Sequence, residues 1–162
     1  MKKGNMLAIG VLAGGIFGVM IDKLLTQSTV KGKQVTTKDK FKIYYNTLNQ
    51  WLGIKQKNKN LSEYFMGKNY KRIAVYGLGE MGNRLIDELL DTTIEVVYGV
   101  DKNINHTFCS MTVYALEDIG NASKEIDVIV VTPVFAFDEI VDLLKEKVDC
   151  DIVSLEDVVF EM

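Results

Sequence analysis

Short apolar runs and helical apolar stripes alternate along the second half of the chain. The runs are rich in Val, Ile and Tyr, as buried parallel strands are. The stripes space their apolar residues three and four apart, as amphipathic helices do. The runs predict strands at 73–76, 94–100, 112–114, 127–132 and 151–155, and the stripes predict helices at 83–91, 116–119 and 135–147, before a last short turn at 156–162.

This alternation predicts the α/β class, with a small five-stranded, parallel, Rossmann-like sheet. Right-handed crossovers favour the strand order 3-2-1-4-5. The side chains expected to face the sheet are Leu85, Ile86, Leu89 and Leu90 in the first of these helices and Ile140, Val141, Leu143 and Leu144 in the last.

A longer helix is predicted before the first strand. Thr36 and Asp39 fit a capping box, and Gly53 is expected to end the helix. A second, short helix is expected at 62–66, after a charged turn. This hairpin either packs on the flank of the following domain or docks a partner enzyme or a second copy of the chain. The apolar stripe of the long helix consists of Phe41, Tyr44, Tyr45, Leu48, Trp51 and Leu52.

Residues 6–21 carry no charge and predict a membrane helix, with a signal peptide and a buried helix as alternatives. Gly10, Gly14 and Gly18 recur every four residues, a spacing that lets membrane helices approach closely. More lysines follow the run than precede it, so the positive-inside rule places the remainder in the cytoplasm. The predicted organisation is an anchor at 1–25, a basic linker at 26–36, a helical extension at 37–69 and a nucleotide-binding domain at 70–162.

A glycine-rich turn follows the first predicted strand. Gly77, Gly79 and Gly82 form a GxGxxG motif, and the next strand ends at Asp101. In a dinucleotide-binding unit the first glycine allows a tight turn, the second admits a pyrophosphate, and the third lets helix and strand pack closely. The terminal carboxylate binds ribose hydroxyls and favours NAD over NADP. Glu80 would oppose a phosphate if its side chain pointed inward, but its place at the helix start predicts that it faces solvent.

The carboxyl ends of the first and fourth strands should therefore form the ligand crevice. The expected ligand is NAD or a nucleotide-sugar. The predicted binding residues are Gly77, Leu78, Gly79, Glu80, Met81, Gly82, Asp101, Lys102, Thr132 and Pro133.

Charge and composition narrow the possible functions. The net charge of −3 is the sum of oppositely charged parts of the chain: residues 31–72 are strongly basic and residues 73–162 are strongly acidic. An acidic domain is a poor nucleic-acid binder. Two cysteines suit a reducing compartment rather than a disulfide scaffold. His106 and Cys109 lack the further partners that a metal or catalytic site needs, so neither role is expected.

The motifs resemble the cofactor-binding half of the glucose-fructose oxidoreductase/inositol dehydrogenase family. The matching segments are GLGEMG at 77–82, VD at 100–101, VYALEDI at 113–119 and DVIVVTP at 127–133. The chain is equally similar to small nucleotide-sugar-binding Rossmann domains of bacterial capsule and lipopolysaccharide biosynthesis proteins. Either resemblance, over residues 70–160, implies a bound dinucleotide or nucleotide-sugar, and the second implies a role in surface-polysaccharide assembly.

The chain departs from the oxidoreductase pattern where that family does its chemistry. The family follows its Thr-Pro with a histidine and later with a catalytic lysine, whereas Phe135, Phe137 and Asp138 occupy the first of these regions here. We therefore expect no catalytic residue. The leading hypothesis is a membrane-anchored, non-catalytic sensor or adaptor that binds NAD or a nucleotide-sugar. The alternatives are the cofactor half of an NAD-dependent oxidoreductase or epimerase that needs a partner chain, and a structural adaptor with an empty crevice.

Overall fold

The computed structural model describes residues 35–102, 104, 111–120 and 125–162. The chain divides into two compact units, residues 1–35 and 36–162. The first unit lies almost wholly outside the described residues, and so does the predicted membrane run at 6–21. No helix within the described ranges is long and apolar enough to cross a bilayer.

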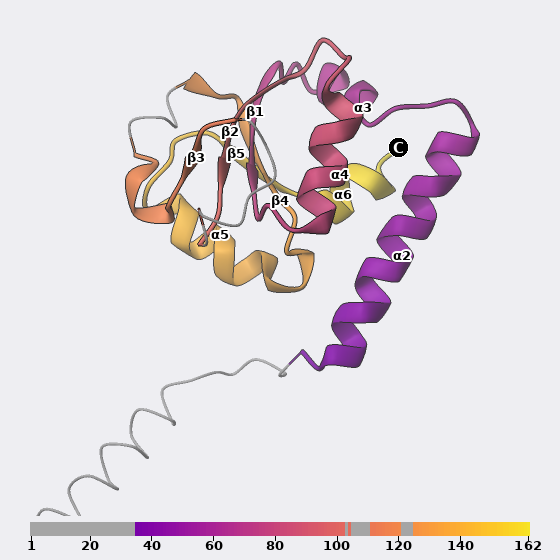
Figure 1. Ribbon diagram of the computed structural model, residues 1–162, viewed down its shortest axis with the longest axis horizontal. Helices are drawn as coiled ribbons and strands as arrows, with labels where there is room; N and C mark the ends of the chain where they lie inside the picture. Colours follow the sequence, from indigo (N-terminus) through magenta and orange to yellow (C-terminus); the bar gives the residue numbers. More distant parts are fainter. Residues whose placement is uncertain (1–34, 103, 105–110, 121–124) are drawn as a thin grey trace, which may run out of the picture. The chain divides into compact units, whose positions relative to one another are not determined.

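The second unit is built on one five-stranded sheet (Figure 1). Every neighbouring pair of strands is parallel, and the order is β3-β2-β1-β4-β5. This order confirms the predicted α/β class and the Rossmann-like topology. The strands are β1 (Arg72–Tyr76), β2 (Glu95–Val100), β3 (Val113–Tyr114), β4 (Val128–Val131) and β5 (Asp151–Ser154).

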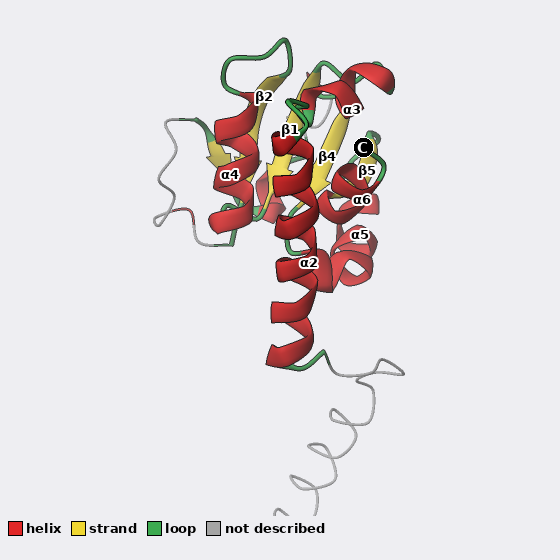
Figure 2. Ribbon diagram, turned by 90° about the vertical axis from the view of Figure 1, so that its right-hand side faces the viewer, coloured by secondary structure: helices red, strands yellow, loops and turns green. Residues whose placement is uncertain are grey.

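Helices cover both faces of the sheet (Figure 2). Successive side chains of a strand point to opposite faces, so Ile73 and Val75 of β1 enter one core while Ala74 and Tyr76 enter the other. The first core is completed by α2 (Thr37–Gln56), α3 (Ser62–Gly67), α4 (Glu80–Leu89) and α6 (Leu155–Phe160). The second is completed by α5 (Phe137–Lys145), near the 3-10 turns η2 (Leu116–Asp118) and η4 (Val134–Ala136).

The helix α2 begins as predicted and ends later than predicted. Thr36 and Asp39 form the expected capping box, with the Thr36 Oγ1 accepting from the Asp39 N–H. Gly53 does not end the helix, which continues to Gln56. The glycine is tolerated because Trp51 and Ile54 are buried on either side of it, and this packing outweighs its helix cost of about 1 kcal/mol.

The predicted apolar stripe of α2 divides into two faces. Trp51 is buried in the core, and Tyr44 packs partly against it. The inner face is completed by Thr47 and Ile54, which the stripe did not include. The remaining members of the stripe, Phe41, Tyr45, Leu48 and Leu52, are exposed. The hairpin thus packs on the flank of the domain, and it leaves a second apolar face in solvent.

Three smaller expectations about the helices are wrong. The first helix after β1 starts at Glu80 rather than at residue 83, because Gly79 already serves as its N-cap. Leu90, just past the end of α4, and Leu143 on α5 are exposed rather than turned toward the sheet. The segment after β5 is the helix α6 rather than a turn, and Ser154 caps it by accepting from the Glu156 N–H.

Glu88 joins the helical hairpin to α4. Its carboxylate accepts a hydrogen bond from the Trp51 indole Nε1 at 2.6 Å and one from the Leu61 backbone N–H at 2.8 Å. The Lys55 ammonium lies 3.5 Å from the same carboxylate, whose side chain is only 7% exposed. Together with the packing of Trp51 and Ile54 in the core, these bonds fix α2 against the domain.

Candidate functional site

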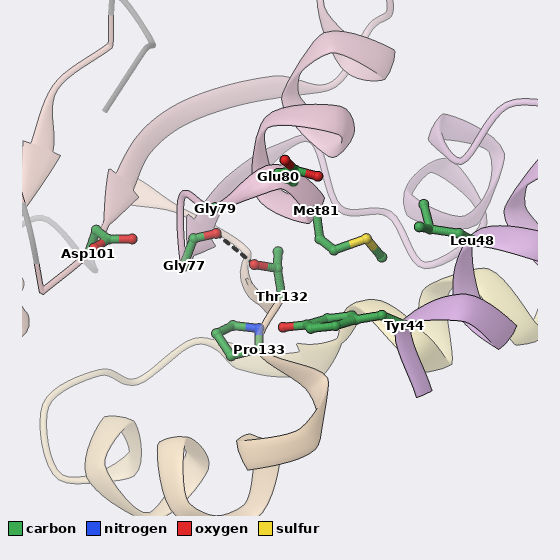
Figure 3. A pocket seen from close by; sticks show the side chains of 9 residues that line it. All are labelled: Tyr44, Leu48, Gly77, Gly79, Glu80, Met81, Asp101, Thr132 and Pro133. Carbon is green, nitrogen blue, oxygen red and sulfur yellow. Dashed lines mark hydrogen bonds between the residues drawn. The ribbon is translucent and has the colours of Figure 1, made fainter. Parts of the chain in front are cut away.

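A cleft of about 430 Å³ opens at the carboxyl ends of β1, β2 and β4 (Figure 3). This is the edge of the sheet at which doubly wound α/β folds bind ligands. The turn from β1 into α4 forms its floor, the end of β2 lies to one side, and the end of β4 and α2 lie to the other. The lining residues are Tyr44, Leu48, Gly77, Gly79, Glu80, Met81, Asp101, Thr132 and Pro133.

Gly77 has to be glycine for two reasons. Its φ of +88° lies in the left-handed region that other residues avoid. A Cβ at this position would also lie 2.7 Å from the Pro133 ring. The Gly77 N–H donates to the Val100 carbonyl at 2.8 Å. The turn is thereby fixed to the ends of β2 and β4 at once.

The other two glycines of the motif play different parts. Nothing lies within 4 Å of where a Gly79 Cβ would be, so this side of the loop is open. A Cβ on Gly82 would collide with the Gly77 carbonyl oxygen, which shows how closely α4 lies against the turn. Gly79 is the N-cap of α4. The first-turn N–H groups of a helix lack intrahelical acceptors and attract anions, so the open surface beside Gly79 is suited to a phosphate.

Asp101 holds the loop from the β2 side. Its Oδ2 accepts a hydrogen bond from the Leu78 backbone N–H at 2.7 Å. The Leu78 side chain is buried and packs against Gly99, where a Cβ would lie 2.6 Å from it. A carboxylate carries about four lone-pair sites, enough to hold this N–H and to accept from the hydroxyls of a ribose.

Thr132 holds the loop from the β4 side. Its hydroxyl lies 2.6 Å from the Gly77 carbonyl oxygen, to which it donates, and 3.2 Å from that of Tyr76. Pro133 follows in a γ-turn, with φ −73° and ψ 66°, that the Val134 N–H closes by donating to the Thr132 carbonyl. The Thr132 hydroxyl proton is thus committed to the loop, so this residue positions the glycine turn.

Two residues of α2 complete the crevice. Tyr44 lies beside Pro133, with its hydroxyl directed toward the proline, and Leu48 lies farther along the helix (Figure 3). The Tyr44 ring meets the Phe135 ring edge-on at 5.7 Å, and the Lys40 ammonium lies 4.2 Å from the centre of the same Phe135 ring. Burial raises the pKa of the Tyr44 phenol.

The sequence placed Tyr44 and Leu48 only in an apolar stripe and did not assign them to the site. Helical spacing identifies which residues share a face of α2, but it does not say what that face meets. The interaction of the Tyr44 ring with Phe135, a residue far away in sequence, brings α2 to the crevice. No short-range signal could have indicated it.

The structure brings most of the predicted binding residues together. Glu80 is exposed on the rim, as its helix-start position predicted (Figure 3). Leu78 and Gly82 are buried and shape the loop without lining the cleft, and Lys102 is exposed outside it. The predicted residues that line the cleft are Gly77, Gly79, Glu80, Met81, Asp101, Thr132 and Pro133.

Metal-binding chemistry has no candidate in the described part of the chain. The described residues contain no cluster of His, Cys, Asp and Glu that could hold a metal ion. His106 and Cys109 lie outside the described residues.

The strand order and the glycine turn over the start of α4 define a Rossmann-type α/β domain. No protein-family model and no curated protein matches the chain. Among solved structures the chain is similar to UDP-D-quinovosamine 4-dehydrogenase from Vibrio fischeri, with 21% sequence identity and a TM-score of 0.41 over 56% of this chain and 84% of that one. Membership of the glucose-fructose oxidoreductase/inositol dehydrogenase family stays a prediction.

Proposed function

We propose that this chain is a nucleotide-binding module that holds the diphosphate of NAD or of a nucleotide-sugar above Gly79. The observation that carries the proposal is the open surface at Gly79, directly over the N-terminus of α4. Neighbouring positions in the same loop are closed by Pro133 and by the Gly77 carbonyl. An anion is thus admitted at the one point of the turn where helix N–H groups can meet it.

The two sides of the cleft suit the two ends of such a ligand. Asp101 lies on the β2 side, where a ribose attached to the diphosphate can donate its hydroxyls. The same negative charge disfavours a 2′-phosphate, so NAD is preferred over NADP. On the β4 side, Tyr44, Leu48 and Met81 offer an apolar wall against which a nicotinamide or a sugar ring can lie.

We propose that the module binds its ligand without transforming it. The titratable side chains that line the cleft are Tyr44, Glu80 and Asp101. Burial raises the pKa of Tyr44, which makes it a poor source of a phenolate base, and the Asp101 carboxylate accepts from the Leu78 N–H of the loop. The proposed role is to sense the ligand or to present it to a partner at the cytoplasmic face of a membrane, with residues 6–21 as the anchor. The resemblance to capsule and lipopolysaccharide proteins suggests surface-polysaccharide assembly as the setting.

Calorimetric titration of the full chain with NAD, NADP, UDP and UDP-sugars tests the proposal. We expect saturable binding of NAD or of a UDP compound, and at least tenfold weaker binding in Gly79→Val, because the added side chain occupies the phosphate position. Gly53→Val is the matched control, since Gly53 also has open space around it but lies away from the cleft. Absence of binding at millimolar ligand, or equal binding in Gly79→Val, would refute the proposed function. Ligand turnover by the chain alone would refute the non-catalytic part.

A further inference from the structure

One face of α2 exposes four large apolar side chains in a row. They are Phe41, Tyr45, Leu48 and Leu52, with 72%, 60%, 45% and 56% of their surface exposed. A neighbouring face of the helix packs against the domain through Trp51 and Ile54, while the row itself stays exposed in the part of the chain that the structure describes. An exposed apolar row of this kind often marks an interaction site, so we expect a partner to cover it.

The size of the row fits one side of a protein interface. With about 200 Å² for each side chain, the exposed fractions amount to roughly 450 Å². That area lies within the range of about 300–600 Å² for the largest apolar patch of a typical soluble monomer, a patch that is often functional. Two such rows against one another would bury roughly 900 Å² of apolar surface. Flanking polar residues would bring the total near the lower limit of about 1,000–1,200 Å² for a specific interface.

The spacing of the row makes it complementary to itself. Its residues are separated by four, three and four positions, and this pattern reads the same from either end. Two antiparallel copies about a twofold axis between Tyr45 and Leu48 would therefore place Phe41 against the partner's Leu52 and Tyr45 against the partner's Leu48. These are the layers of an antiparallel helix pair, and such a contact closes as a dimer rather than growing into a fibre.

We propose that α2 forms an antiparallel pair with the α2 of a second copy of this chain, through Phe41, Tyr45, Leu48 and Leu52. Leu48 belongs to both the pair and the wall of the cleft. The second copy thereby covers the outer side of the nucleotide crevice near this residue. The pairing does not depend on the proposed ligand.

Cysteine cross-linking tests the alignment directly. The full chain is prepared with Cys109 and Cys150 replaced by alanine, and Phe41→Cys and Leu52→Cys are introduced separately. We expect a short bifunctional maleimide to link the two variants when they are mixed and to leave each variant alone unlinked. The reason is that two copies of position 41, or of position 52, lie roughly 16 Å apart along an antiparallel pair. Asn46→Cys, on the polar side of α2, is the control that should not link.

Each other outcome overturns the proposal. Cross-linking of either variant alone would show that the two α2 helices run parallel. Copies that associate through another part of the chain would give this result. Absence of cross-linking in the mixture shows that this face has another occupant or none. Light scattering gives a second readout: Leu52→Glu should weaken the dimer at least tenfold, whereas Asn46→Glu on the polar face should not. Neither measurement uses a nucleotide, so failure of the pair and failure of the proposed ligand site are distinguishable.

Discussion

The Glu88 carboxylate bonds two parts of the helical hairpin to α4, and this predicts a large effect of a single substitution. Glu88→Ala removes the acceptor of the Trp51 indole N–H and that of the Leu61 backbone N–H. A hydrogen bond to a charged group contributes about 1.5–3 kcal/mol, and a buried donor left without a partner has its own desolvation cost. We therefore expect Glu88→Ala to lower the free energy of unfolding by about 3 kcal/mol. For a domain of this size the melting temperature should fall by roughly 6–12 °C.

Glu88→Gln is the matched control for this prediction. Glutamine keeps the packing and one acceptor oxygen, but its amide N–H₂ then faces one of the two donors, so about half of the loss is expected. Urea unfolding followed by circular dichroism measures both variants, and Trp51→Phe completes a double-mutant cycle. A coupling energy of at least about 1 kcal/mol between Glu88 and Trp51 is expected. A Glu88→Ala protein within about 0.5 kcal/mol of wild type would show that the carboxylate does not hold the hairpin.

Three further predictions follow from the same structure. Gly82→Ala should destabilise the domain by about 1–3 kcal/mol, because the methyl group meets buried backbone; a thermal melt at or above that of wild type would contradict this. The backbone N–H groups of Arg72 and Lys71 lower the pKa of Asp127, so its contribution to stability is present above about pH 4 and is lost as the pH falls through the lowered native pKa. Asp127→Asn should flatten the acid side of a stability–pH profile, and an unchanged profile would count against it. Burial raises the pKa of Cys150 to about 11, so the native protein should leave this thiol unmodified by maleimide at pH 7 until it is denatured.

The parts of the fold that depend on local chemistry could be predicted from the sequence. The capping box at Thr36, the glycine turn at Gly77 and the strand that ends at Asp101 each rest on residues close together in the chain. Right-handed crossovers then allow few sheet orders, and the predicted order is the observed one. The residues on the floor of the cleft were identified in the same way.

The parts that depend on distant contacts could not be predicted. Gly53 is a helix-ending residue by propensity, and burial of Trp51 and Ile54 overrides that propensity. The division of the α2 stripe into a buried and an exposed face depends on where the domain surface lies. Tyr44 lies at the cleft because α2 packs on the domain, where its ring meets Phe135, about ninety positions later in the sequence.

The glycine turn is held from both sides by its own protein. The Asp101 carboxylate and the Thr132 hydroxyl already fix its Leu78 N–H and Gly77 carbonyl. A diphosphate that binds here would therefore contact a turn that is already ordered, so binding would carry no entropic cost of ordering the loop. The glycine turn should have the same conformation with and without ligand. The association rate should be limited by diffusion and charge rather than by rearrangement of the loop.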